Sequence, residues 1–286
     1  MSSIFYKPSG KFNFFTLLII VFIGILWASL LNVLYLGLQW FIPFVYLNIL
    51  LTIGLGYASF SGINVLHKLF KLRNVKAAFI STTIIILVSI YIQWVVYVLW
   101  MFNEDRADTL AYLMTTFDRK GDFVYLFSHP NNLLALISTL NEQGTLTING
   151  QVVSNVFLLI IWIIEALLLI IIPLLMQFGG QVFKPFSESS QQWMKKRKLL
   201  SFYPYVEDIA SLEQSLLLGD TARMQEALPA DELPSHYAQY FVFESPEDDY
   251  QYLVVENIRE STNKKGERQK DEDTIIEYLR IKAGTL

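Results

Sequence analysis

The sequence contains no cysteine in its 286 residues, which excludes a disulfide framework, thiol catalysis, cysteine-bound zinc and iron–sulfur clusters. It also contains no phosphate-binding glycine loop, no nucleophile elbow and no HExxH motif. The three histidines, His67, His129 and His236, are too far apart in the sequence to show a metal-ligand spacing. We therefore expect no catalytic residues, no metal and no cofactor, and a protein that is not an enzyme.

Charged residues are scarce and unevenly distributed along the chain. Only 17% of the residues are charged, whereas 53% are hydrophobic, which is the composition of a membrane protein. A helix needs about 20 mostly apolar residues to cross a bilayer core, and four stretches meet this requirement. We predict a transmembrane domain over residues 1–180, an all-α four-helix bundle whose spans cover residues 12–38, 41–60, 77–102 and 156–178.

The basic residues that flank the predicted spans indicate the orientation of the chain. Lys7 and Lys11 precede the first span, four Lys and Arg residues lie between the second and third spans, and a basic cluster follows the fourth. The outer loop 103–154 instead carries six acidic residues against three basic ones. Both termini are therefore expected in the cytoplasm. No sorting or retention signal is found, so the default location is a plasma membrane, the bacterial inner membrane.

The outer loop 103–154 is long enough to contain structure of its own. The stretch "HPNNLLALISTLNEQG" is typical of a short helix with a polar start after Pro130 and with Gly144 as its C-terminal cap. The stretch "TLTINGQVV" places Asn149 and Gly150 between two β-prone runs, which predicts a hairpin. We expect a small extracytoplasmic helix–hairpin cap, which is either a lid over a ligand site or a packed connection between two spans.

Residues 181–200 are expected to be a basic juxtamembrane linker. Their aromatic and basic residues include Trp193, Lys195, Lys196, Arg197 and Lys198. A basic cluster beside an aromatic residue is typical of a segment that lies against anionic lipid headgroups. Membrane lipids are therefore an expected partner of this segment. The alternative is that the cluster acts only as a topology signal.

Residues 201–286 form an acidic region. From position 199 onward the chain carries eighteen Asp and Glu residues against eight Lys and Arg residues, which argues against nucleic acid as a partner. Two stretches, "VEDIASLEQSLLLGD" and "TARMQEALPADELP", are typical of helices, and three β-rich stretches follow them. We predict a cytoplasmic α+β domain of two helices on a three-stranded antiparallel meander. Its edge strands either accept a strand from a protein partner or are blunted by their own charges.

Glu165 lies near the middle of the fourth predicted span, in the run "LLIIWIIEALLLIIIP". A carboxylate that faced lipid at this depth would cost about 3 kcal/mol on insertion scales, so the side chain is expected to point into the bundle. No Lys or Arg lies within any predicted span. We therefore expect a protonated carboxyl that hydrogen-bonds an amide such as that of Gln93, unless a cation is bound.

Polar residues on the other three predicted spans lie at helical spacing, so that each span has one polar face. If these faces converge, they form a polar pocket that opens outward beneath the cap and ends at Glu165. The alternative is a buried hydrogen bond that only fixes helix packing. The candidate members of this intramembrane polar site are Glu165, Gln93, Asn48, Asn32, Tyr97 and Trp162.

These expectations favour a multi-pass membrane protein of non-enzymatic type that signals or acts as a scaffold, with a protein partner bound to its cytoplasmic domain. The alternative is a small proton- or cation-linked transport or channel component that uses Glu165. Whether the protein is a single chain or a homo-oligomer is left open by the sequence. A membrane-embedded enzyme would need several reactive groups at one depth, and only Glu165 qualifies. The two main hypotheses differ in whether the function resides in the C-terminal domain or at the intramembrane carboxyl.

Overall fold

The computed structural model of the protein describes residues 4–41, 45–102, 120–148, 150–220, 226–229, 234–262 and 268–284. The chain divides into two compact units. The first comprises residues 11–182, and the second combines residues 1–10 with residues 183–286. The first unit is helical, and the second is built on an antiparallel β-sheet.

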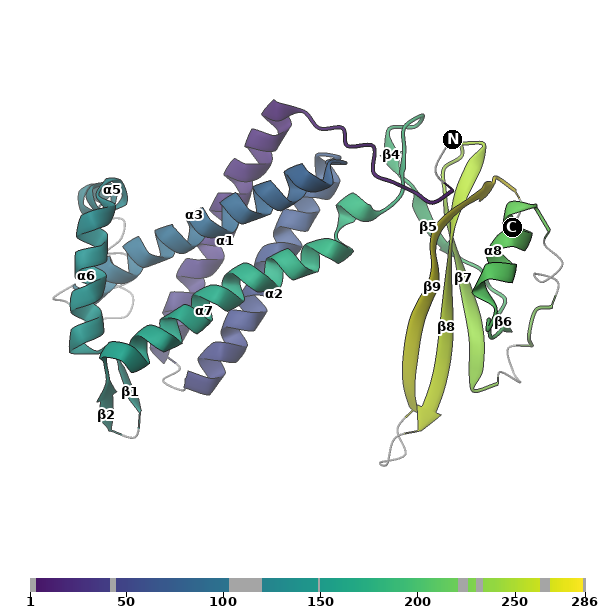
Figure 1. Ribbon diagram of the computed structural model, residues 1–286. Helices are drawn as coiled ribbons and strands as arrows, with labels where there is room; N and C mark the ends of the chain where they lie inside the picture. Colours follow the sequence, from purple (N-terminus) through teal and green to yellow (C-terminus); the bar gives the residue numbers. More distant parts are fainter. Residues whose placement is uncertain are drawn as a thin grey trace. The chain divides into compact units, whose positions relative to one another are not determined.

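Four long helices make up most of the first unit (Figure 1). Each of them is long and apolar enough to cross a membrane, as the sequence predicted. Helices α1 and α7 each contact both α2 and α3, so the four helices pack together. The second helix continues past residue 60 because Ile63 and His67 are both buried. The helices are α1 (Phe14–Phe41), α2 (Val45–Leu69), α3 (Val75–Met101) and α7 (Asn155–Met176).

Glycine residues allow these helices to approach one another closely. A Cβ atom added to Gly24 of α1 would overlap the side chain of Ile85 in α3. A Cβ atom added to Gly62 of α2 would overlap the indole of Trp27 in α1. The Trp27 indole also donates a hydrogen bond to the Ala58 carbonyl oxygen, 3.3 Å away. Small residues at such contacts are typical of helices that pack within a membrane.

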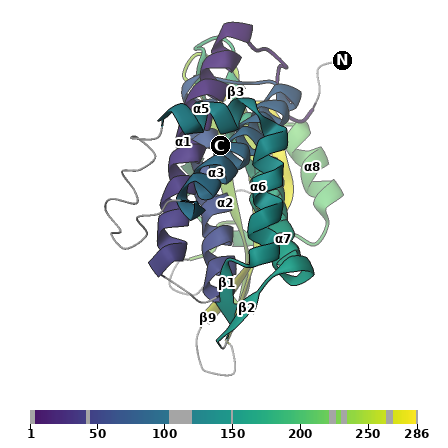
Figure 2. The same ribbon diagram turned by 90° about the vertical axis from the view of Figure 1, so that its left-hand side faces the viewer.

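A smaller substructure, the cap, connects α3 to α7 (Figure 2). It contains α5 (Lys120–Ser128), α6 (Pro130–Gln143) and the hairpin of β1 (Leu146–Ile148) and β2 (Gln151–Val153). The predicted helix and hairpin are therefore present, whereas α5 was not predicted. Helix α6 begins with a proline and ends at Gly144, whose φ is 80°, a backbone conformation that favours glycine. Both α5 and α6 pack on α3, and α6 also contacts α7.

The second unit contains a five-stranded antiparallel sheet, larger than the predicted three-stranded meander. The meander itself is present as three long strands that pair in sequence order. Two further strands pair with the outer side of β7, so that the strand order is β5-β7-β8-β9 with β6 also on β7. The strands are β5 (Lys195–Lys198), β6 (Tyr203–Pro204), β7 (His236–Glu244), β8 (Tyr250–Thr262) and β9 (Arg268–Lys282).

The predicted linker 181–200 differs most from its sequence interpretation. It contains β3 (Phe186–Ser187) and β4 (Gln192–Trp193), which pair with each other, and then β5. Four consecutive basic residues show no alternation of polar and apolar side chains, so no local pattern predicted a strand here. Strand β5 is instead held by β7, with Lys196 opposite Phe243 and Arg197 opposite Val242.

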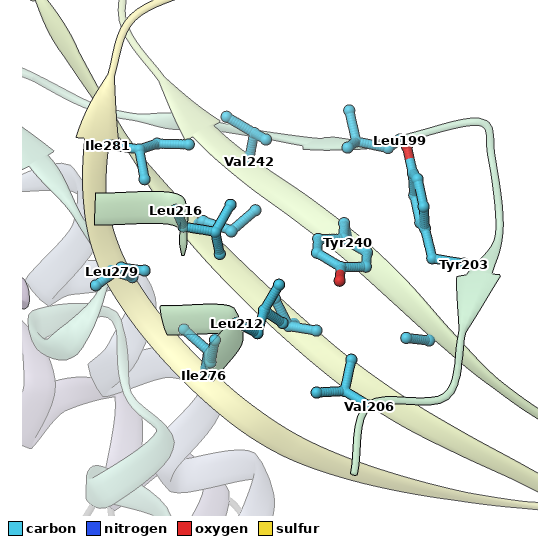
Figure 3. Packing of buried hydrophobic residues seen from close by; sticks show 13 residues of the cluster. Leu199, Tyr203, Val206, Leu212, Leu216, Tyr240, Val242, Ile276, Leu279 and Ile281 are labelled. Atoms are coloured by element: carbon cyan, nitrogen blue, oxygen red, sulfur yellow. The ribbon is translucent and has the colours of Figure 1, made fainter. Parts of the chain in front are cut away.

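Helix α8 (Ile209–Leu217) covers one face of the five-stranded sheet (Figure 3). Its first turn is capped by Asp208, whose carboxylate accepts a hydrogen bond from the Ser211 amide at 3.0 Å. Leu212 and Leu216 point from α8 into the core. Most of the second helix predicted for this domain lies outside the described residues. Its described residues 226–229 are not helical, because Leu228 pairs antiparallel with Phe202. The core beneath α8 contains Leu199, Tyr203, Val206, Ala238, Tyr240, Val242, Leu253, Val255, Ile276, Leu279 and Ile281.

The N-terminal arm, defined here as residues Ile4–Tyr6, belongs to the second unit although it precedes α1. Phe5 pairs antiparallel with Leu279 of β9. The Tyr6 amide donates to the Tyr278 carbonyl oxygen at 3.0 Å, and the Arg280 amide donates to the Ile4 carbonyl oxygen at 2.8 Å. The arm therefore extends the sheet at the β9 edge.

Candidate functional site

The candidate site is a small cavity inside the helical unit, next to Glu165. Its volume is about 50 Å³, which is room for a few water molecules or one small cation. All four long helices and strand β1 of the cap contribute to its wall. The described residues that line it are Leu36, Gln39, Asn48, Gln93, Trp94, Tyr97, Leu146, Ile161, Trp162 and Glu165.

The Glu165 carboxyl on α7 is hydrogen-bonded to α1. The Tyr35 hydroxyl lies 3.2 Å from Glu165 Oε1, and the Gln39 amide donates to the same oxygen at 3.4 Å. Gln39 Nε2 also donates to the Tyr35 hydroxyl at 2.6 Å. Tyr35 is only 3% exposed, so this contact between α1 and α7 is shielded from the surroundings.

The Tyr35 hydroxyl extends this network to α2. It lies 2.7 Å from Thr52 Oγ1, and Thr52 donates its own hydrogen to the Asn48 carbonyl oxygen at 2.8 Å. The hydrogen of Tyr35 is therefore shared between Thr52 and an ionised Glu165, because a hydroxyl donates only once. A protonated Glu165 supplies the missing hydrogen by donating to Tyr35, which then donates to Thr52. Proton binding at Glu165 thus changes the hydrogen bonds that join three helices.

Two amide oxygens at the cavity have no hydrogen-bond partner among the described residues. They are Oδ1 of Asn48 and Oε1 of Gln93. Asn48 is only 4% exposed, and a buried carbonyl oxygen without a donor is costly. Together with Glu165, these oxygens make the cavity rich in acceptors, and none of the described lining residues is Lys, Arg or His. Such a site fits a small cation or a ligand that carries hydrogen-bond donors.

Three aromatic rings form one wall of the cavity. The ring centroids of Trp94 and Trp162 are 4.9 Å apart, and those of Trp94 and Tyr97 are 5.6 Å apart, both with edge-to-face geometry. Trp162 also packs in the apolar cluster that joins α3 and α7 to α6 of the cap. The aromatic wall therefore connects the polar site to the cap.

The structure brings most of the predicted polar residues together. Gln93, Asn48, Tyr97 and Trp162 line the same cavity as Glu165. Asn32 is buried, at 2% exposure, but it is not among the residues that line the cavity.

The sequence interpretation missed the direct partners of Glu165. Tyr35 and Gln39 follow Asn32 at steps of three and four residues, which is the spacing of one helix face. Gln39 lay outside the predicted first span, whereas α1 continues to Phe41. Continuing the polar face of the first span from Asn32 would have found Tyr35 within the span and, past residue 38, Gln39.

A second polar cluster lies where α7 ends. Thr82 of α3 donates to Oε1 of Gln177 at 3.3 Å, and the Gln181 amide donates to Oδ1 of Asn64 in α2 at 2.7 Å. His67 of α2 is fully buried and lies 3.1 Å from Ser81 Oγ of α3. This cluster ties α2 and α3 to the 3-10 turns η1 (Gln177–Gly179) and η2 (Gln181–Phe183) that follow α7.

The predicted lipid-contact residues lie in and beside β5 of the second unit. The four basic side chains of β5 are exposed. Arg197 forms a two-bond ion pair with Glu244, at 2.9 and 3.0 Å, which holds the pKa of Glu244 below its ordinary value. Lys196 Nζ lies 3.8 Å from the centre of the Phe241 ring. Trp193 packs edge-to-face on Phe186, with ring centroids 5.0 Å apart. Several of these side chains therefore stabilise the unit as well as presenting charge.

No known protein family, curated protein or solved structure matches this chain. Within the described residues, no three His, Cys, Asp or Glu side chains are grouped so that they could hold a metal ion. A cation at Glu165 would be held by one carboxylate and neutral oxygens, which suits a proton or a weakly bound ion better than a tightly held transition metal.

Proposed function

We propose that the protein is a multi-pass plasma-membrane protein of non-enzymatic type that carries a signal across the membrane to its C-terminal domain. The signal is the binding of a proton or small cation at Glu165. In this proposal the four long helices cross the membrane as a bundle, the cap lies outside, and both termini lie in the cytoplasm. The C-terminal domain binds a protein partner, and the basic residues of β5 face lipid headgroups.

The pairing of the N-terminal arm with β9 supports this arrangement. The arm precedes the first long helix and β9 follows the fourth, so they can meet only if both lie on the same side of the membrane. A chain that crosses the membrane four times returns to the side on which it began, which agrees with this pairing. The basic residues Lys7 and Lys11 next to α1 favour the cytoplasmic side.

The hydrogen bonds between Glu165 and α1 are the observation that carries the proposal. Glu165 belongs to α7, and its partners Tyr35 and Gln39 belong to α1. Helix α7 continues through η1 and η2 into the second unit, and α1 is joined to the arm on β9 by residues 7–13. The two helices that meet at Glu165 are therefore the two that the chain connects directly to the C-terminal domain.

The acceptor of the Tyr35 hydroxyl hydrogen depends on whether Glu165 is protonated, and this dependence starts the signal. When Glu165 is protonated, Tyr35 donates to Thr52 and the contacts among α1, α2 and α7 are complete. When Glu165 is ionised, the Tyr35 hydrogen turns to the carboxylate and the Thr52 contact loses its hydrogen. The α1–α2 contact and the α1–α7 contact thus compete for one hydrogen. In this proposal the exchange of hydrogen bonds changes the spacing between α1 and α7, and residues 7–13 transmit that change from α1 to the arm.

A fluorophore on the segment between the arm and α1 tests this proposal. Because the chain has no cysteine, Ser9→Cys provides a single labelling site at an exposed residue. In nanodiscs the label is expected to respond to a pH series, and Glu165→Gln is expected to abolish the response. Glu142→Gln, which changes an exposed acid of α6, is the matched control and should respond as the unchanged protein does. An equal response with Glu165→Gln would contradict the proposal.

A second candidate function is a small proton- or cation-linked transport or channel component. The unpaired oxygens of Asn48 and Gln93 beside the Glu165 carboxyl favour it, because a cation that leaves water needs replacement oxygens. Proton or potassium flux into proteoliposomes distinguishes the two functions. Transport predicts flux that Glu165→Gln abolishes, whereas signalling predicts no flux above that of empty liposomes.

A further inference from the structure

The β9 edge of the five-stranded sheet has two halves of different character. The first half carries the consecutive charged residues Lys270, Asp271, Glu272 and Asp273, and charges of this kind discourage strand pairing. The second half, from Ile276 to Lys282, contributes the apolar residues Ile276, Leu279 and Ile281 to the buried core. Within the described residues, the arm is the segment that pairs with the outer side of β9, and it pairs only with this second half.

Tyr6 is the most deeply buried side chain of the arm. Tyr6 packs edge-to-face on Tyr252 and Tyr278, with ring centroids 5.2 and 6.2 Å apart. These rings belong to an aromatic cluster on the face of the sheet opposite α8. Ile4 and Phe5 are 48% and 38% exposed, whereas Tyr6 is more deeply buried. The arm is therefore a short strand with one aromatic anchor and two main-chain hydrogen bonds to the neighbouring strand.

The β9 backbone is irregular where the arm binds. The register between β8 and β9 shifts between the pairs Leu253–Leu279 and Val255–Ile276, and Tyr278 has a φ of 55°. A bulge of this kind redirects side chains and interrupts regular pairing on an edge strand. The carbonyl oxygen of this same residue accepts the bond from Tyr6. The edge is thus shaped to take a short segment, and continuous pairing along its whole length is interrupted.

We propose that the apolar half of the β9 edge is a docking site for an extended segment of a partner protein, and that the N-terminal arm occupies this site until such a segment displaces it. The segment that fits has the chemistry of the arm, an apolar residue followed by two aromatic residues. Its second aromatic residue takes the place of Tyr6, and main-chain hydrogen bonds form with Tyr278 and Arg280. The proposal identifies the partner-binding surface of the signalling function, and its test does not involve Glu165.

Binding of a synthetic peptide tests this surface. The probe is SSIFYKPSGKF, residues 2–12 of the chain, labelled with a fluorophore and titrated against the full chain and against a variant that lacks residues 2–6. The variant is expected to bind about tenfold more tightly or better, because the intact chain offers the edge only while the arm is released. Tyr6→Ala in the intact chain releases the anchor without a deletion and should also increase peptide binding. Circular dichroism establishes that both variants retain their strands.

Two N-methylated peptides form the matched pair. Methylation of the amide of residue 6 removes the donor to the Tyr278 carbonyl oxygen, so binding is expected to be lost. Methylation at residue 5 changes an amide that antiparallel alternation directs away from β9, so binding should persist. Equal binding of the two peptides would overturn the proposal. So would failure of both arm variants to bind the unmodified peptide more tightly than the intact chain does.

Discussion

Replacement of Tyr35 by phenylalanine is expected to destabilise the helical unit measurably. The substitution keeps the ring, which is only 3% exposed, and removes one hydroxyl oxygen. That oxygen contacts Thr52 at 2.7 Å, Glu165 at 3.2 Å and Gln39 at 2.6 Å. Hydrogen bonds between helices within a membrane contribute about 0.6 kcal/mol on average and about 1.7 at most. Loss of three contacts should therefore lower the free energy of unfolding by about 2 kcal/mol.

The assay is equilibrium unfolding in mixed micelles with increasing SDS, followed by helical circular dichroism. Tyr57→Phe is the matched control, because Tyr57 on α2 is 58% exposed and its hydroxyl makes no hydrogen bond with any described residue. We expect no measurable change from it. If Tyr35→Phe costs no more than Tyr57→Phe, the hydrogen-bond network around Glu165 does not hold the helices together. That result would refute the argument from the hydrogen count at Tyr35.

Two further predictions concern packing and pH. Gly24→Ala is expected to lower the free energy of unfolding by about 1–3 kcal/mol, because the added methyl overlaps an isoleucine side chain of α3. Gly54→Ala, which has nothing within 4 Å of the added atom, should not lower it in the same SDS titration. Burial raises the pKa of Tyr252 to about 12, and a tyrosine in an unfolded chain ionises near pH 10. Folding of the C-terminal domain should therefore be stabilised by this residue below about pH 10 and lose that contribution as the pH rises towards 12. Absorbance at 295 nm should show tyrosines, Tyr252 and Tyr278 among them, that ionise near pH 12 and not near pH 10. Tyr252→Phe should reduce this late absorbance change by the contribution of one residue.

Much of the fold follows from patterns that span many residues. The four long helices were predictable because mostly apolar runs of about twenty residues or more leave few alternatives to a helix in a membrane. The meander was predictable because β7, β8 and β9 are long and separated by charged turns. Both signals lie within single segments of the chain, and neither depends on contacts with distant residues.

The elements that escaped prediction depend on distant partners. Strand β5 is four basic residues long and exists because β7 pairs with it. The N-terminal arm has three residues, and its bonds to Tyr278 and Arg280 join the two ends of the chain. No local pattern encodes such contacts, since the main-chain bonds to an open edge require no particular residue type and the partners of Tyr6 are distant in the sequence.

The polar residues around Glu165 were partly predictable. Asn48 and Gln93 are conspicuous in apolar helices, because burial of an amide is costly without a partner. Tyr35 gave no comparable signal, since tyrosines are common near the ends of membrane helices as interfacial anchors. Spacing along a helix shows which residues share a face, but it does not show which helices meet. Only the packing of α1 against α7 identifies Tyr35 as the partner of the carboxyl.

Infrared difference spectroscopy of the Glu165 carboxyl shows whether this group binds a proton or cation. The protein would be studied in nanodiscs over a pH series and with added monovalent cation, and Glu165→Gln would identify the band. We expect the carboxyl band to lose intensity to carboxylate bands as the pH or the cation concentration rises. We also expect the Tyr35→Phe substitution to shift the frequency of the carboxyl band. A Glu165 band that stays unchanged under all of these conditions would contradict the proposal.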